Sequence, residues 1–118
     1  MINIDIYESK INIILLDSVE DSEVYIKKFN KKYKTNHEVY SFEGCVFVLP
    51  NRVYNLVFVK PFINTNLLSH ECFHLTSLVS DSCDVTDTGN REERSYLNGF
   101  INQKVRNYLV DKKKLLIL

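Results

Sequence analysis

The residues of this 118-residue chain that could carry out chemistry are concentrated in the segment His70-Glu71-Cys72-Phe73-His74. The segment matches the pattern HExxH, in which two histidines stand four positions apart. Residues i and i+4 lie on one face of a helix, so both imidazoles can reach a single metal ion. Imidazole suits zinc, and a carboxylate beside the water on a bound zinc can take a proton from that water. The motif therefore predicts a zinc site in which His70 and His74 are ligands and Glu71 is the general base.

A five-residue pattern also arises by chance, and a histidine on an apolar helix face is commonly an ordinary core residue. The surroundings of the motif argue against that interpretation. Two of the three histidines in the chain fall at positions i and i+4, on a predicted helix that follows a predicted strand. A catalytic zinc site has three protein ligands and one open position, so a further ligand must lie elsewhere in the chain.

Three kinds of third ligand can be compared with the sequence that follows His74. The elongated motif with a glycine and a third histidine is excluded, because Ser77 and Ser80 occupy those positions. An aspartate ligand would have to come from a polar segment in which solvated carboxylates are expected. The aspartates of that segment are Asp81, Asp84 and Asp87.

A glutamate at the start of the next helix fits the spacing. Glu92 and Glu93 follow His74 after 17 and 18 intervening residues, which lets a second helix turn back alongside the first. Glu92 shares a stripe of that helix with the small residues Ser95 and Gly99, and small residues let two helices approach closely. The register therefore favours Glu92 as the third ligand and leaves Glu93 as the reserve candidate.

The motif region resembles a family of small phage and prophage proteins described as zinc metallopeptidases. Their pattern is HExxH, a short polar loop, and then E-x-x-A-Y with an apolar stretch that contains glycine. In this chain the match runs from Ser69 to Phe100, about a quarter of the sequence, with Ser95 in place of the alanine. The resemblance implies a minimal zincin-like domain of the class with a glutamate ligand, and it supports Glu92 in that role. It implies little about the substrate.

Other polar residues near the motif have less specific roles. Tyr96 follows Glu92 by one turn and could donate a hydrogen bond to an oxyanion, although a tyrosine that packs between helices is an equal alternative. Asp84 or Asp87 could orient a ligand imidazole, but solvated loop acids are the simpler interpretation. His37 has no partner at metal-binding spacing and is expected on the surface.

Hydrophobic periodicity predicts the elements that position the motif. Strands are expected at 11–16, 45–49 and 53–59, and Asn51-Arg52 would join the last two as a hairpin. Helices are expected at 20–33, at about 64–79 with the motif, and at 91–110. Asp17 or Ser18 would cap the first helix, and Asn64, Thr65 or Asn66 the second. This order predicts a small α+β domain in which about three helices pack on one face of a short sheet.

The tail KKKLLIL places four apolar residues after three lysines, and these residues need cover. They would either add an edge strand or contact a neighbouring subunit. Self-association through the C-terminal tail is therefore one of the expected partner interactions.

Composition and charge narrow the class of protein. The length fits one domain, residues 1–118, and 45% hydrophobic with 25% charged residues is typical of soluble globular chains. Fifteen basic and fifteen acidic residues cancel, so the basic surplus of a nucleic-acid binder is absent. The sequence contains no apolar run long enough to span a membrane, and its three cysteines lack CxxC spacing. The first ten residues, MINIDIYESK, do not have the pattern expected of a signal peptide. We therefore expect a cytoplasmic protein (in the host if a phage encodes it, or else in a virion) that acts on or binds a protein or peptide.

Two functions remain open from the sequence. The first is a zinc-dependent hydrolase, a peptidase, in which the strand 53–59 presents an edge to an extended peptide. The second is a non-enzymatic phage protein, a virion component or a host-protein binder, that keeps the zincin fold and the metal. Only 26 residues follow Glu92, so the second lobe that walls the cleft of larger glutamate-ligand peptidases is not expected.

Overall fold

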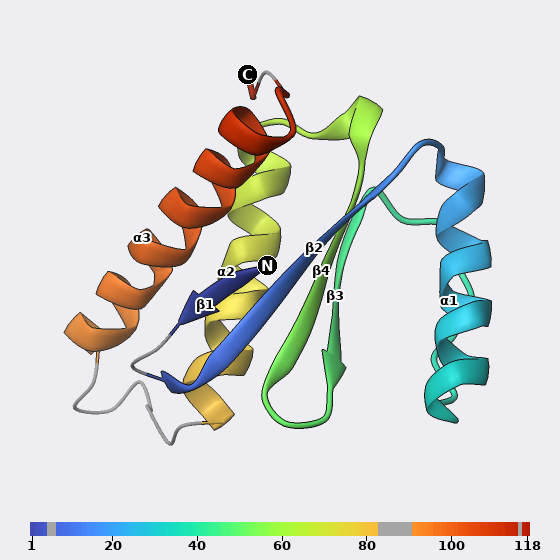
Figure 1. The fold of residues 1–118 in the computed structure, drawn as a ribbon, viewed down its shortest axis with the longest axis horizontal. Coiled ribbons are helices and arrows are strands. Elements are labelled where there is room, and N and C mark those ends of the chain that lie inside the picture. Colours follow the sequence, from blue (N-terminus) through green and yellow to red (C-terminus); the bar gives the residue numbers. More distant parts are fainter. Residues whose placement is uncertain (5–6, 83–90, 116) are drawn as a thin grey trace.

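The computed structural model describes residues 1–4, 7–82, 91–115 and 117–118, which form a mixed α+β fold. A four-stranded sheet lies between α1 on one face and the pair α2 and α3 on the other (Figure 1). The strands are β1 (Ile2–Ile4), β2 (Ser9–Leu16), β3 (Gly44–Leu49) and β4 (Val53–Val59). The helices are α1 (Val19–Tyr33), α2 (Thr65–Ser82) and α3 (Arg91–Asn107), with a 3-10 turn η2 (Lys60–Phe62) before α2 and a π turn η3 (Tyr108–Lys112) after α3. Among the helices in these ranges, none is both long and apolar enough to cross a bilayer.

The order of the strands, β1-β2-β4-β3, places β3 at an edge of the sheet. β4 runs parallel to β2 and antiparallel to β3, with Gly44 opposite Phe58 and Leu49 opposite Val53. β4 therefore has a strand partner on both sides. The expectation that the strand 53–59 offers an edge to a peptide is wrong, because within the described residues the unpaired edge on this side belongs to β3.

Local capping interactions fix where α1 and α2 begin. The side chain of Ser18 accepts a hydrogen bond from the N–H of Asp21 at 3.4 Å and caps α1. The side chain of Asn64 accepts a hydrogen bond from the N–H of Leu67 at 2.9 Å, so Asn64 caps α2. Both residues were among the predicted caps. Because α2 begins at Thr65, the metal motif falls in its second and third turns.

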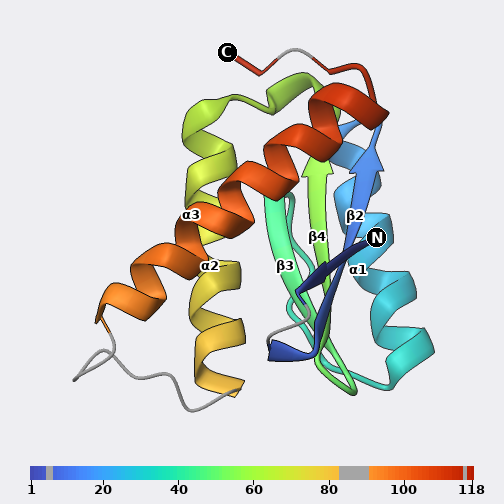
Figure 2. The same cartoon turned by 60° about the vertical axis from the view of Figure 1, so that its left-hand side comes forward.

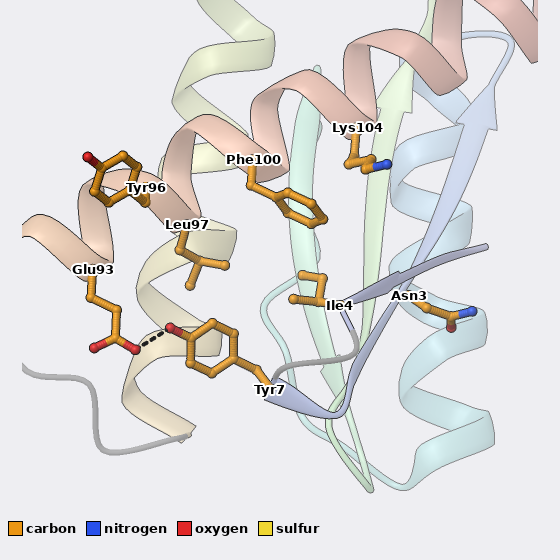
Figure 3. A pocket seen from close by; sticks show the side chains of 8 residues that line it. All are labelled: Asn3, Ile4, Tyr7, Glu93, Tyr96, Leu97, Phe100 and Lys104. Atoms are coloured by element: carbon orange, nitrogen blue, oxygen red, sulfur yellow. Dashed lines mark hydrogen bonds between the residues drawn. The ribbon is translucent and has the colours of Figure 1, made fainter.

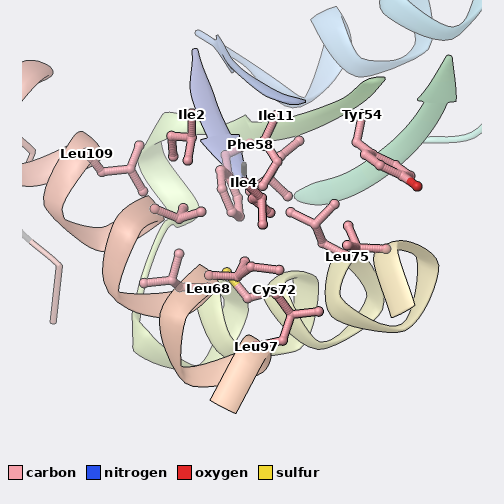
Figure 4. Close-up of a cluster of buried hydrophobic side chains, with 14 residues drawn as sticks. Ile2, Ile4, Ile11, Tyr54, Phe58, Leu68, Cys72, Leu75, Leu97 and Leu109 are labelled. Atoms are coloured by element: carbon pink, nitrogen blue, oxygen red, sulfur yellow. The ribbon is translucent and has the colours of Figure 1, made fainter. Parts of the chain in front are cut away.

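The larger of two hydrophobic clusters fills the space between the sheet and the pair α2 and α3 (Figure 4). Leu68, Cys72, Leu75 and Val79 of α2 recur at helical spacing and are at most 1% exposed. Their packing anchors one side of α2 in the core and leaves the opposite side for the motif. The sheet, α3 and η3 complete the cluster with Ile2, Ile4, Ile11, Tyr54, Leu56, Phe58, Leu97, Ile101, Val105 and Leu109.

A smaller cluster lies between α1 and the other face of the sheet. It joins Ile26 and Phe29 of α1 to Phe47 and Val57 of the sheet, together with Phe42. Successive strand residues point to opposite faces, so a strand with apolar residues at consecutive positions has to be covered on both sides. The predicted α+β class is confirmed, but the prediction that the helices pack on one face only is wrong.

The C-terminal tail folds back onto its own chain (Figure 2). Leu115 and Ile117 pack against the larger cluster. The carbonyl oxygen of Leu118 accepts a hydrogen bond from the N–H of Thr65 at 2.8 Å and so satisfies one of the unpaired donors at the start of α2. The four-stranded sheet of the described residues contains no strand from the tail, and self-association through the tail stays a prediction.

The fold can be tested at Leu75, which is fully buried between α2 and the sheet. Leu75→Ala should lower the free energy of unfolding by about 2–5 kcal/mol, because the cavity left behind loses packing contacts. Val24→Ala on the exposed side of α1 is the matched control and should change it by less than about 0.5 kcal/mol. Urea denaturation followed by circular dichroism measures both, and equal effects of the two substitutions would contradict the described core.

Candidate metal centre

α2 presents its two histidines on the side that faces away from α3. The side facing α3 is marked by Thr76, whose hydroxyl donates a hydrogen bond to the side-chain oxygen of Asn98 at 3.1 Å. Successive helix residues turn by about 100°, so His70 and His74 lie about 120° and 160° around the axis from Thr76. Both histidines are exposed, and the side chain of His70 keeps 65% of its surface open to solvent.

The two imidazoles converge on one point. Their Nε2 atoms are 3.1 Å apart, and the rings meet edge to face with an interplanar angle of 83°. Two nitrogen ligands about 2.0–2.1 Å from a tetrahedral zinc ion would be about 3.3 Å apart. The helix therefore already holds the two nitrogens at close to the spacing that a shared ion requires.

Glu71 lies next to the histidines on the buried side of α2. One ligand atom from each of His70, Glu71 and His74 lies within 4.8 Å of the others. The Glu71 side chain is only 6% exposed, and its Oε2 atom is buried without a hydrogen-bond partner among the described residues. Burial raises the pKa of Glu71 above its usual value, while the two neighbouring histidines act to lower it. A buried carboxylate with one unsatisfied oxygen beside two imidazoles is the donor set that a divalent cation would satisfy.

The burial of Glu71 depends on Gly44 at the start of β3. A Cβ atom at position 44 would lie 2.9 Å from Cγ of Glu71, closer than real Cβ atoms come to other atoms. It would also lie 3.2 Å from Leu67 and 3.3 Å from Phe58. The absence of a side chain at this position therefore lets the edge strand approach the motif helix closely.

The motif side chains line a pocket of about 490 Å³ between α2 and the segment 40–46. α2 contributes His70, Glu71, His74, Ser77 and Leu78, and the opposite wall consists of Tyr40, Gly44, Cys45 and Val46. In that wall the hydroxyl oxygen of Tyr40 is 3.5 Å from Sγ of Cys45. No sequence pattern singles out these wall residues, because the contact between β3 and α2 is tertiary and has no local signature.

The structure does not bring the predicted glutamate ligands to the histidines. Among the described residues that could hold a metal, the group near the motif contains neither Glu92 nor Glu93. Glu92 is exposed in the first turn of α3. Glu93 accepts a hydrogen bond from the Tyr7 hydroxyl at 2.6 Å, on the side of α3 that faces away from α2 (Figure 3).

Glu92 is far from the histidines because α2 is long and continues for eight residues beyond His74. Cross-helix contacts fix the level of α3: Thr76 with Asn98, Asp81 with Arg94, and Thr65 with Arg106. Interpolation between these contacts places Phe100 level with His74. Glu92 is eight residues earlier in α3, which corresponds to about 12 Å along the helix axis.

Tyr96 also lies away from the motif. Its side chain is 75% exposed and lines a second pocket, between α3 and β1, together with Phe100, Leu97 and Lys104 (Figure 3). The pocket that contains the histidines has no contribution from Tyr96 among its described lining residues. The structure therefore does not place Tyr96 where it could contact a group bound to His70 and His74.

The remaining candidates are engaged elsewhere or lie outside the described residues. Asp81 forms an ion pair with Arg94 at 3.0 Å. Cys72 is fully buried in the larger cluster, on the side of α2 away from the histidines. His37 is exposed, as expected, although its ring packs against Phe29 and Phe47. Asp84 and Asp87 fall in the segment 83–90, which is outside the described part of the chain.

No protein-family model, curated protein or solved structure matches this chain. The chemistry of the site is therefore inferred from the residues and their geometry.

The stability of the metal-free protein should report on the buried carboxylate. Because the pKa of Glu71 is raised in the folded state, the folded protein holds this proton more tightly than the unfolded chain does. Its stability should therefore fall as the pH rises from the ordinary carboxyl pKa through the raised one. Glu71→Gln removes the charge and should raise the free energy of unfolding at pH 7 by roughly 1 kcal/mol.

Denaturation with a chelator present, at several pH values, measures this difference. The gain from Glu71→Gln should shrink as the pH is lowered through the raised pKa. Glu92→Gln, at an exposed carboxylate of α3, is the matched control and should have no such effect. A Glu71→Gln protein that is less stable than the wild type at pH 7 would contradict the described burial.

Proposed function

We propose that this protein is a zinc-dependent hydrolase, a peptidase of zincin type, with its metal held by His70 and His74. The observation that carries the proposal is the buried Oε2 atom of Glu71, which has no hydrogen-bond partner among the described residues, beside two Nε2 atoms that are 3.1 Å apart. A buried carboxylate oxygen without a hydrogen-bond partner is costly, and such groups cluster at functional sites. Glu92 lies about 12 Å along the helix axis from the level of His74, so the third ligand that a zinc site needs stays unassigned among the described residues.

The residues divide the work of hydrolysis between them. When bound, zinc supplies a water of lowered pKa and an electrophile for the carbonyl oxygen. Glu71 takes a proton from the water while the oxygen of that water adds to the carbonyl carbon of the substrate. The C–N bond then breaks, and Glu71 passes the proton to the departing nitrogen, which leaves an acid and an amine.

The edge of β3 favours an extended peptide as the substrate. Gly44, Cys45 and Val46 belong both to this edge strand and to the wall of the metal pocket. A peptide that added to β3 as a further strand would run past the histidines, with its main chain hydrogen-bonded to the edge. In this proposal β3 offers the edge that binds the peptide, in place of the strand 53–59 that the sequence suggested.

The second candidate function is a metal-dependent binding protein without hydrolase activity, acting as a virion component or a host-protein binder. The side chains that could bind the metal favour this second function in one respect. The described group contains two imidazoles and a single carboxylate. If Glu71 coordinates the ion directly, no carboxylate of this group remains to take a proton from water. The role of Glu71 therefore decides between the two functions.

Zinc binding tests the site itself. The wild-type protein should retain one zinc per chain after dialysis, and His70→Ala or His74→Ala should lose it, because each removes one of two imidazole ligands. Glu92→Ala, distant in the structure, should retain the metal and serves as the control. Elemental analysis with circular dichroism to confirm folding measures this. Metal-free wild-type protein would overturn the proposal, and metal loss in Glu92→Ala would show that α3 reaches the site.

Glu71→Gln separates the two functions. As a general base, Glu71 can be replaced by glutamine with zinc retained and hydrolysis lowered at least about 100-fold. The assay is mass spectrometric detection of new termini in a random peptide mixture incubated with wild type or variant. Loss of zinc in Glu71→Gln would identify Glu71 as a ligand and favour the binding protein. Equal cleavage by the two proteins would exclude the proposed mechanism.

A further inference from the structure

We propose that Tyr40 is a catalytic residue of the metal site, whose hydroxyl donates a hydrogen bond to the oxyanion formed when water adds to the scissile carbonyl. The inference rests on the proposed hydrolase function and assigns the electrophilic role to a residue outside α2 and α3. Tyr96, which the sequence suggested for this role, lines a different pocket.

Tyr40 stands in the pocket wall opposite the histidines. The pocket is bounded by α2 on one side and by the segment 40–46 on the other, and Tyr40 lines it together with His70 and His74. A carbonyl group bound between these walls would have imidazole-held metal on one side and the phenol on the other. Ser77 is another hydroxyl in the lining, but it lies three residues after His74 on the same helix and shares the wall of the histidines.

The hydroxyl of Tyr40 is available to donate. Its hydrogen-bonding contact in the described structure is Sγ of Cys45 at 3.5 Å, and a thiol sulfur is a weak acceptor. By comparison, the hydroxyl of Tyr7 is 2.6 Å from a carboxylate oxygen of Glu93. A negatively charged oxygen is a much stronger acceptor than sulfur, so an oxyanion in the pocket would draw the Tyr40 hydrogen away from Cys45.

The backbone around Tyr40 is anchored before any ligand binds. Two residues later, Phe42 is buried in the smaller cluster, and its N–H donates to the side chain of Ser22 at 3.1 Å. On the other side, the Asn30 side chain accepts from the N–H of His37 at 3.0 Å and donates to the carbonyl of the same residue. An anchored backbone limits the reorganisation that Tyr40 needs in order to reach an oxyanion, and little reorganisation is what an oxyanion site requires.

The test uses cobalt(II) in place of zinc, because the visible spectrum of cobalt reports anion binding without turnover. Cobalt-loaded protein is titrated with methylphosphonate, a tetrahedral oxyanion, and with azide, a linear anion whose nitrogens are weaker hydrogen-bond acceptors than phosphonate oxygens. Tyr40→Phe should weaken methylphosphonate binding by about tenfold, the loss expected for one hydrogen bond to a charged acceptor, and weaken azide binding much less. Tyr96→Phe, the matched loss of a hydroxyl outside the pocket, should change neither.

The outcomes distinguish this inference from the proposed function. If Tyr40→Phe changes both anions equally, or neither, the role of Tyr40 is overturned while the metal site stands. If wild-type protein binds no cobalt and no zinc, the proposed function fails and the role of Tyr40 fails with it. A selective loss of methylphosphonate binding in Tyr40→Phe alone, with the wild-type cobalt spectrum retained, supports the inference.

Discussion

The close contact between the backbone of Gly44 and the side chain of Glu71 is the constraint on which the site depends. It brings an edge strand against the motif helix and removes most of the surface of Glu71 from water. The same contact creates the pocket, since one wall is the helix and the other is the start of β3. A larger residue at position 44 would separate the two walls or push the carboxylate outward. The chemistry of Glu71 and the shape of the pocket therefore have a common structural origin.

α2 can carry such an unfavourable arrangement because its other side is strongly anchored. Its apolar residues are packed against the sheet and α3. The C-terminal residue binds the start of the helix at Thr65, and Arg94 of α3 binds its end at Asp81. Burial of a carboxylate with an unsatisfied oxygen costs free energy that the rest of the helix must offset. Functional sites commonly combine local instability with a stable scaffold, and α2 combines both on opposite faces of one helix.

Features that depend on neighbouring residues in the sequence were predicted well. The observed bounds of α1, β3 and β4 differ from the predicted ones by at most one residue, and the caps Ser18 and Asn64 were among those expected. β1 was not predicted, because three residues are too few to show a period. The spacing from His74 to Glu92 suggested a returning helix, but it could not show that α2 continues to Ser82 and so shifts the level of α3. The edge position of β3 and its contact with α2 are set by the order of strands in space, which no local pattern encodes.

The hydrogen bond between Leu118 and Thr65 has a practical consequence for anyone who handles this protein. The C-terminal residue is held at the first turn of α2, five positions before His70, or about 7–8 Å along the helix axis. A polyhistidine purification tag added after Leu118 would start close to the candidate metal centre and would bring additional imidazoles within its reach. Such a tag could supply ligands from outside the fold and so imitate a complete zinc site. A tag at the other end of the chain, removed before the metal content is measured, leaves only the ligands that the fold itself provides.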